Sequence, residues 1–525
     1  MSDVQQALSV ALQQASTGQL TALQSFAAQV LGCDAPRSVQ LDIANGCLSY
    51  GLVSSARQLY ESVVQDNPND LAAQAGLARI ATDTGEHATA TTIYTKLVKQ
   101  YPNNDMVRRN ALVALQYDPA VSEPERLQCA SQWGQWAVRR AGGSRPRPPI
   151  AALGERAPRV GFVSADFCQH TVGLFVKDIL ITLGQRWPVY VYHSRDLQDW
   201  VSKLIQSRCH WRCVADLDDQ ALSDQIIQDD IDILVDLSGH TAGSRLTALA
   251  WRPAPVMVSW LGYFATTGLA YLDGLLMDSW HVPAQGQAQF SEPVIHLPSG
   301  RFFYKPAPWA PKAVAPAPCL SRGHITFGCF NNTAKLNEAV IDVWALVLHA
   351  VAHSRLILKW RTFNDVAYRD TIEAAFAVRG IDAARIEYRG SGFHVDVLNE
   401  YADIDIALDP FPFAGGLTSC EALWMGVPVV TWPQSAVVSR QTFALLSAIG
   451  SADTVADSAD AYVRIASQLA ARPAHLADLR TQLRAQMASS KLMDLDAHVS
   501  GLQQTLLSIH QHVLSQQERA GSSER

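Results

Sequence analysis

The sequence lacks the segments that carry a protein into or across a membrane. None of its apolar runs reaches the roughly 18 residues that a bilayer span needs. The first residues, MSDVQQALSVALQQ, carry an acid and several glutamines where a secretory signal has basic and then apolar residues. We therefore expect a cytoplasmic protein with no membrane span.

An excess of positive charge is also missing. The 525-residue chain has a formal net charge of -7 at pH 7, whereas a nucleic-acid-binding surface is normally basic. This charge predicts that nucleic acid is not a partner. With 48% hydrophobic and 17% charged residues, the composition is that of a globular protein, and the length predicts two or three separate cores.

Cysteines are few and poorly spaced for a metal. The chain has nine, and the one close pair, Cys209 and Cys213 around His210, has no second pair at ligand spacing. We expect free thiols rather than a zinc site, and hence a reducing compartment.

The first 140 or so residues contain a helical repeat. Three pairs are separated by 34 positions in the segments 56–70 and 90–104: Ala56 with Ala90, Tyr60 with Tyr94, and Pro68 with Pro102. Ala44 and Ala78 keep the same spacing in the preceding helices. This pattern resembles the tetratricopeptide repeat, in which alanines allow two helices to approach, a tyrosine fills the gap and a proline ends the second helix. Helices at about 1–34 and 106–140 are expected to flank it; a generic helical bundle is the alternative.

Two series of short apolar runs follow, each interleaved with helical stretches. Near-continuous Val, Ile and Leu over five to eight residues is typical of parallel strands buried on both faces. Gly-, Pro- and Arg-rich residues 141–159 precede the first series, and Pro/Ala-rich residues 305–323 separate it from the second. The expected strands are 159–166, 188–193, 231–239, 255–262 and 273–278, then 325–330, 355–360, 385–390, 404–411 and 428–432.

These patterns predict an all-α repeat domain followed by two α/β lobes and helices from about 455. The expected domains are residues 1–145, 158–305, 322–480 and 481–525. Ligands of parallel sheets lie at the carboxyl ends of the strands, so we expect the site in a cleft between the lobes. The absence of G-x-G-x-x-G and P-loop motifs disfavours NAD and ATP and favours a nucleotide-sugar enzyme.

The segment 409–430, DPFPFAGGLTSCEALWMGVPVV, predicts a diphosphate site. A strand ends near Asp409, and after a turn a helix starts near Leu417. Its unpaired backbone N–H groups form an anion pocket with nearby hydroxyl groups, and its glutamate is placed to bind a ribose diol. An ordinary glycine-started helix with an acid at its positive end is the alternative. The expected binding residues are Gly415, Gly416, Leu417, Thr418, Ser419 and Glu421.

Four motifs, in order, resemble the catalytic region of the O-GlcNAc transferase family. They are RVGFVSADFCQH (159–170), RPAPVMVSWLGY (252–263), FGCFNNTAKLN (327–337) and GGLTSCEALWMGVPVVT (415–431). The resemblance implies a GT-B fold of two Rossmann-like lobes, a UDP-sugar donor, inversion at the anomeric carbon and no metal or other cofactor. Flagellin-modifying transferases and bacterial N-glucosyltransferases are related branches, so a protein acceptor such as flagellin or another surface protein, held by the repeats, is implied.

The resemblance also assigns roles to single residues. Lys335 matches the lysine that contacts the donor diphosphate, and a cation there offsets charge on the leaving group when no Mg²⁺ is present. Asn332 matches a donor-contacting amide. His170 matches the active-site histidine, as a general base or a hydrogen-bond partner of the sugar, and Asp166 is expected to cap its loop. His240 and His394 are further candidate binding residues, for the substrates and for the uracil ring.

At several positions the sequence departs from the family pattern, so the resemblance does not identify the transferred sugar. Gly416 and Leu417 replace a frequent His and Thr, Ala414 replaces an Asn, and residues 264–267 read Phe-Ala-Thr-Thr where Pro-Gly-Thr-Ser is common. The last of these borders the N-acetyl pocket in family members, so GlcNAc and glucose or another hexose are both retained. A non-catalytic scaffold and another GT-B nucleotide-sugar enzyme are the competing hypotheses.

Overall fold

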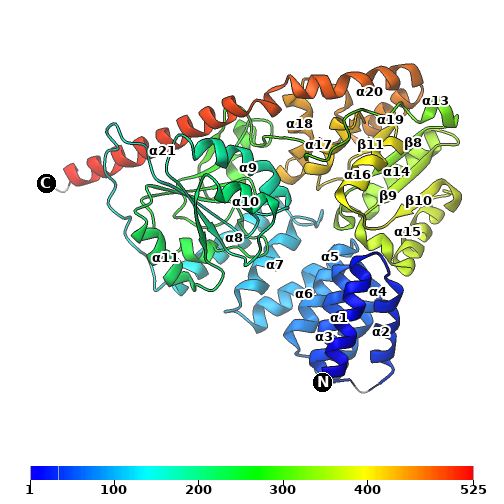
Figure 1. The fold of residues 1–525 in the computed structure, drawn as a ribbon, viewed down its shortest axis with the longest axis horizontal. Coiled ribbons are helices and arrows are strands. Elements are labelled where there is room, and N and C mark those ends of the chain that lie inside the picture. Colours follow the sequence, from blue (N-terminus) through cyan, green and yellow to red (C-terminus); the bar gives the residue numbers. More distant parts are fainter. Residues whose placement is uncertain (1, 34, 524–525) are drawn as a thin grey trace. The chain divides into compact units, whose positions relative to one another are not determined.

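The computed structural model describes residues 2–33 and 35–523, which form two compact units (Figure 1). Unit 1 contains the N-terminal helices up to residue 119 together with residues 309–433 and 453–484. Unit 2 contains residues 120–308, 434–452 and the chain from 485 onward. Each unit thus combines one α/β lobe with helices from other parts of the chain. The predicted domain limits stay predictions.

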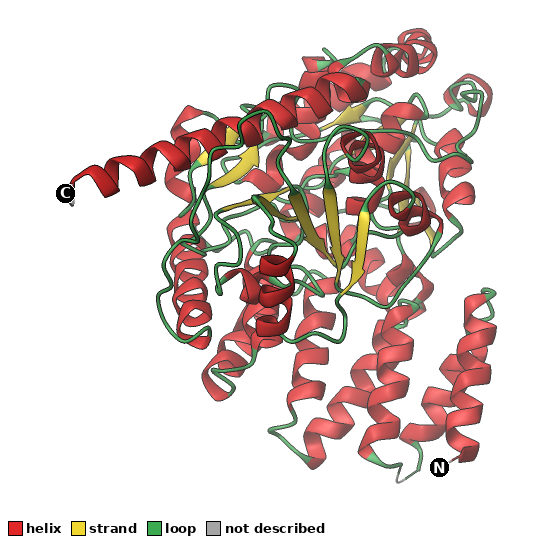
Figure 2. Ribbon diagram, turned by 60° about the vertical axis from the view of Figure 1, so that its left-hand side comes forward, coloured by secondary structure: helices red, strands yellow, loops and turns green. Residues whose placement is uncertain are grey.

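The helical repeat predicted from the 34-residue period is confirmed. Ala44 and Ala78 are fully buried between paired helices, and Tyr60 lies so close that a Cβ on Gly76 would be 2.5 Å from its ring. Figure 2 shows this N-terminal segment as an entirely helical array. Its helices are α1 (Ser2–Ser16), α2 (Thr21–Leu31), α3 (Arg37–Ser49), α4 (Val53–Asp66), α5 (Leu71–Asp83), α6 (His87–Gln100) and α7 (Asp105–Leu115).

Unit 2 is built on a parallel seven-stranded sheet in the order β3-β2-β1-β4-β5-β6-β7. The five predicted strands are confirmed as β1 (Val160–Ser164), β2 (Val189–His193), β4 (Ile233–Asp236), β5 (Val256–Trp260) and β6 (Gly274–Met277). The two strands missed from the sequence are the edges, β3 (His210–Cys213) and β7 (Val294–His296). Edge strands are half exposed, so the continuous apolar run that identified the others is absent. The helices of this unit's sheet are α9 (Thr171–Leu183), α10 (Trp200–Gln206), α11 (Asp219–Gln228) and α12 (Leu246–Leu249).

Unit 1 contains the second parallel sheet, in the order β10-β9-β8-β11-β12. All five of its strands were predicted: β8 (Thr326–Cys329), β9 (Arg355–Lys359), β10 (Ile386–Arg389), β11 (Ile406–Leu408) and β12 (Val429–Val430). Its helices are α13 (Cys319–Arg322), α14 (Glu338–Ala350), α15 (Val366–Val378), α16 (His394–Glu400), α17 (Leu417–Trp424) and α19 (Ala459–Ala470). Two Rossmann-like sheets that follow a helical repeat along the chain confirm the predicted fold class.

The C-terminal part of the chain is helical, as expected, through α18 (Gln441–Ala448), α20 (Pro473–Ala488) and α21 (Leu495–Ser523). Within residues 2–33 and 35–523, no helix has both the length and the apolar character needed to cross a bilayer. All nine cysteines are free thiols.

Helix α8 (Glu123–Arg140) packs backbone to backbone against a loop of unit 2. A Cβ on Gly134 would lie 1.8 Å from the carbonyl oxygen of Gly268, and a Cβ on Gly268 would lie 1.9 Å from that of Ala130. Gly268 also has a φ of 77°, which side chains rarely tolerate. The two glycines therefore allow a contact that no larger residue permits.

Gly134→Ala tests this contact. In an exposed helix the change is stabilising by about 1 kcal/mol, but here we expect a loss of about 2 kcal/mol or more because backbone must move. Thermal or urea unfolding measures it, with Gln135→Ala, an exposed neighbour in the same helix, as the control. A Gly134→Ala protein as stable as Gln135→Ala would contradict the packing.

Candidate functional site

The candidate site of unit 1 lies where the order of the strands reverses. Strands β8 and β11 are neighbours, and the chain leaves β8 toward β9 on one side and β11 toward β12 on the other. At such a switch point the loops after the two strands separate, and ligands of open parallel sheets bind there. The loop after β8 carries Lys335, and the loop after β11 consists of residues 409–416.

The ammonium of Lys335 joins these two loops. Its Nζ donates to the Ala414 carbonyl at 2.9 Å and to Oδ1 of Asn331 at 3.0 Å, and it lies 4.7 Å from the centre of the Phe413 ring. Thr418 Oγ1 donates to the same Asn331 oxygen at 3.0 Å. The amide of Asn331 therefore links the lysine to the first turn of α17.

Burial lowers the pKa of Lys335 to about 8, because the site gives the ammonium little water, while the nearby Asp409 carboxylate partly opposes this effect. The Asp409 carboxylate forms hydrogen bonds with other groups: it accepts from the backbone N–H of Gly415 at 2.6 Å and from Thr431 Oγ1 at 2.7 Å. The lysine is thus a cation held mainly by neutral oxygens and an aromatic face. Binding of an anion would compensate its charge.

Helix α17 begins at Leu417, as predicted, with Gly416 as its N-cap. A Cβ on Gly415 would lie 2.2 Å from Ser419 Oγ and 3.0 Å from the Asp409 carboxylate, so a larger residue there would displace these side chains. Backbone N–H groups in the first turn of a helix have no partner inside the helix and attract anions. The predicted residues Gly415, Gly416, Leu417, Thr418 and Ser419 follow directly after Ala414, whose carbonyl accepts from Lys335.

His394 and Glu421 form a pair beside this turn. The Nε2 of His394 lies 2.7 Å from Oε1 of Glu421, and its Nδ1 accepts from the indole N–H of Trp309 at 3.2 Å. With Nδ1 as the acceptor, Nε2 carries the proton and donates to the carboxylate. The pair leaves the second carboxylate oxygen for another donor, such as a ribose hydroxyl.

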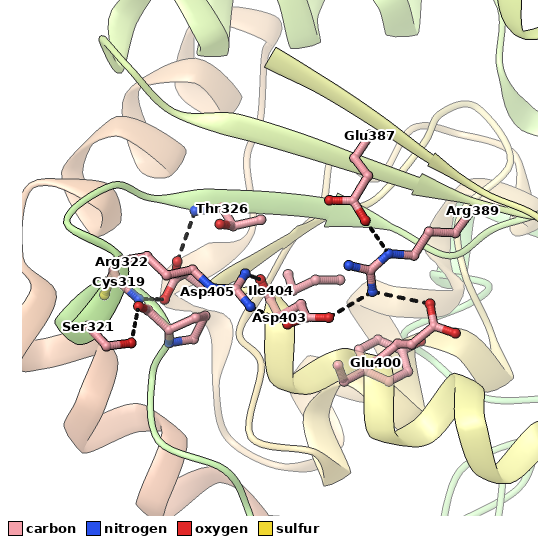
Figure 3. A network of polar contacts seen from close by, with 12 residues as sticks. Cys319, Ser321, Arg322, Thr326, Glu387, Arg389, Glu400, Asp403, Ile404 and Asp405 are labelled. Carbon is pink, nitrogen blue, oxygen red and sulfur yellow. Dashed lines mark hydrogen bonds and ion pairs between the residues drawn. The ribbon is translucent and has the colours of Figure 1, made fainter. Parts of the chain in front are cut away.

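An ion-pair network fixes the helix that presents His394. Glu400, at the C-terminal end of α16, accepts from Lys359 at 2.8 Å and from Arg389 at 3.2 Å. Figure 3 shows the Arg389 guanidinium between Glu400, Asp403 and Glu387. Asp405 accepts the backbone N–H groups of Cys319 and Thr326 at 3.0 and 2.8 Å, which fixes the start of β11 (Figure 3). This network positions α16 without contributing to the anion pocket.

Asn331 and Phe413 were not predicted from the sequence, where the neighbouring Asn332 was the candidate. The Asn332 side-chain oxygen accepts from the N–H of Ala334 at 3.1 Å and caps the short 3₁₀ helix η2 (Thr333–Lys335). Its predicted contact with a donor stays a prediction. The two consecutive asparagines indicated that an amide lies near the lysine, but only the structure shows that it is Asn331 that contacts Lys335.

Unit 2 carries the other two predicted histidines, also at a switch point. Strands β1 and β4 are neighbours there, and the Ser164 and Ser238 hydroxyls, at the ends of these strands, are 3.0 Å apart. His170 caps α9: its Nδ1 accepts from the Val172 N–H at 3.3 Å and lies 3.5 Å from the Asp166 carboxylate. Its side chain is 47% exposed.

His240 is buried and lies under the loop that precedes Gly268. Its Nε2 donates to the Thr267 carbonyl at 2.8 Å, and its ring meets Trp133 of α8 edge to face at 4.5 Å. Thr267 and Thr266 in turn donate to the buried carboxylate of Glu292. The predicted role of His240 as a substrate contact stays a prediction; in this geometry it supports residues 264–267.

Two parallel sheets, each with candidate residues at its switch point, are the fold of a nucleotide-binding protein, and comparison with known proteins gives the family. The chain matches the model of glycosyl transferase family 41 over residues 149–305 and 318–502, and a tetratricopeptide repeat model over residues 48–115. The chain belongs to glycosyl transferase family 41.

Its relatives include proteins named probable UDP-N-acetylglucosamine–peptide N-acetylglucosaminyltransferase SPINDLY. That of Petunia hybrida is 34% identical over 415 residues, which are 78% of this chain and 44% of the relative. That of Arabidopsis thaliana is 33% identical over 409 residues, 77% of this chain and 44% of the relative. The chain thus matches less than half the length of these relatives. Among solved structures, a lysine-to-methionine mutant of the Thermobaculum terrenum O-GlcNAc transferase matches with a TM-score of 0.88 and 28% identity, covering 98% of both chains.

The pKa of Lys335 predicts how anion binding depends on pH. With a pKa of about 8, the amine is mostly charged at pH 7 and mostly neutral at pH 9, so affinity for UDP is expected to fall about tenfold over this interval. Lys335→Arg is the matched control, because a guanidinium keeps its charge throughout. Calorimetric titration at several pH values measures both; an affinity of the unmodified protein that stays constant from pH 7 to 9 would count against a cationic role.

Proposed function

We propose that the chain is an inverting, metal-independent glycosyltransferase. It moves a sugar, GlcNAc or a hexose, from a UDP-sugar to a Ser, Thr or Asn side chain of a protein acceptor. One observation carries this proposal. At the β8/β11 switch point, Lys335 donates to Ala414, just before α17, and is linked through Asn331 to Thr418 in the first turn of that helix. Family membership and the names of the relatives support the same class of donor and acceptor.

Departure of UDP places negative charge on the β-phosphate, and the protein must stabilise that charge. The Lys335 ammonium and the backbone N–H groups at residues 416–418 are fixed donors that need little rearrangement during the reaction. With these donors in place, no metal or other cofactor is required in the proposed mechanism. Glu421 and His394 are assigned to the ribose and the uracil, and Asn332 to a further donor contact.

His170 is the proposed group on the acceptor and sugar. When Nδ1 accepts from the Val172 N–H, Nε2 carries the proton and donates a hydrogen bond to the sugar or the acceptor. When Nδ1 instead carries a proton directed at Asp166, Nε2 becomes a base for the acceptor hydroxyl or amide. The nitrogen that carries the proton therefore decides which of these two roles His170 takes.

The repeats are proposed to hold the protein acceptor, since stacked helix pairs build extended surfaces suited to peptides. Flagellin or another surface protein is the acceptor class that the related branches suggest. We place the reaction in the cytoplasm.

Titration with UDP tests the donor site. Lys335→Ala removes a charged hydrogen-bond donor, an effect of about 2 kcal/mol that corresponds to roughly 30-fold weaker binding. Lys96→Ala, which removes an exposed lysine of α6, is the control and should bind as the unmodified protein does. No detectable UDP binding by the unmodified chain would contradict the proposal and favour a non-catalytic scaffold.

Intact-mass measurement of a coexpressed acceptor tests the reaction. We expect one sugar increment, whose mass distinguishes N-acetylhexosamine from hexose. His170→Ala is expected to lower this modification by about 100-fold or more while leaving UDP affinity within about twofold, because general acid–base groups contribute to the chemical step. Full modification of the acceptor by His170→Ala would exclude this histidine from catalysis.

A further inference from the structure

We propose that the turns of the helical repeats are a structural part of the donor site and position Lys335. This inference rests on the proposed donor site. Three successive turns, spaced by the 34-residue period, contact the loops that follow β9, β8 and β11, which are neighbours in the sheet in that order. One hydrophobic core, running from α1–α5 into the sheet of unit 1, lies behind these contacts.

The first turn contacts the loop after β9. Gly51, between α3 and α4, has a φ of 78°, and a Cβ on it would lie 2.0 Å from the Arg361 carbonyl oxygen. Ser54 donates to the Asp365 carboxylate through its N–H at 2.7 Å and its Oγ at 3.0 Å. Asn364 Nδ2 donates to the Tyr50 carbonyl at 2.8 Å. Backbone and side chains of the repeat thus fix residues 361–365.

The second turn, 34 residues further on, contacts the loop that carries the lysine. Gly85, between α5 and α6, has a φ of 82°, and a Cβ there would lie 2.3 Å from the carbonyl oxygen of Leu336. The buried Thr333 Oγ1 lies 2.7 Å from the Asp83 carbonyl oxygen, to which it donates. The backbone on both sides of Lys335 therefore rests on the end of α5.

The third turn contacts the loop after β11. Tyr117 follows α7 and occupies the position 34 residues after Asp83. Its ring stacks on Phe413 with centroids 4.5 Å apart and an angle of 22° between the planes. The Phe413 ring in turn contacts the Lys335 ammonium at 4.7 Å. Tyr117 therefore supports the aromatic surface on which the ammonium lies.

These contacts restrain both ends of the lysine side chain. A free lysine has four rotatable side-chain bonds and samples many positions, whereas electrostatic catalysis needs a donor that is already in place. The repeats supply that restraint through Thr333 and Leu336 at the backbone and through Phe413 at the ammonium. Thr333, Gly85 and Tyr117 are positioning residues in this scheme.

Gly85→Ala tests the scheme in the full chain. The added methyl group must push Leu336 and move Lys335, and a displacement of this kind is expected to weaken UDP binding by about tenfold. Gly18→Ala is the matched control: Gly18 also has a positive φ, 90°, in a repeat turn, but no atom lies within 4 Å of the added Cβ. It should change UDP affinity by less than about twofold.

Tyr117→Leu provides a second variant and decides the question if Gly85→Ala does not fold. Loss of the stacked ring lets water reach Lys335 and leaves its ammonium less firmly held, so UDP affinity should fall. Water also raises the pKa of Lys335 above its present value of about 8, so the decline of UDP affinity with pH should begin at a higher pH. A folded variant with unchanged affinity and an unchanged pH profile would overturn the positioning role. If the unmodified protein binds no UDP, the proposed donor site itself fails, which is a different outcome.

Discussion

The donor site depends on one electrostatic constraint, a lysine ammonium that is withdrawn from water and held by neutral groups. Two neutral oxygens and an aromatic ring hold Nζ of Lys335, and burial lowers its pKa to about 8. Such a charge is costly until an anion approaches it. The N-terminal turn of α17 is linked to this lysine through Thr418 and Asn331, and the first turn of a helix attracts the same kind of ligand.

The surrounding structure maintains this arrangement. Asp409 ties the glycine turn to β12 through Gly415 and Thr431, and Asn331 ties Lys335 to Thr418. The repeat turns restrain the same loops from outside the sheet. In unit 2, His170 occupies the equivalent place in its own sheet, after a strand at the switch point. Each parallel sheet therefore presents its candidate site residues where its strand order reverses.

Much of this could be predicted from the sequence, and the failures have physical causes. Apolar runs identified the central strands but not β3 and β7, because edge strands are partly exposed. The glycine turn and the start of α17 at Leu417 followed from local chemistry. The contacts of Tyr117, Phe413 and Asn331 join segments about 80 to 300 residues apart, and nothing in local spacing reports such contacts. The 34-residue period predicted the helical repeat but not that its turns contact the loops after β9, β8 and β11.

A crystal structure of the chain with UDP would test the central claim most directly. We expect the diphosphate within hydrogen-bonding distance of Lys335 Nζ and of the backbone N–H groups at residues 416–418, with the ribose beside Glu421. UDP bound elsewhere, or a diphosphate held without either Lys335 or the first turn of α17, would contradict the account.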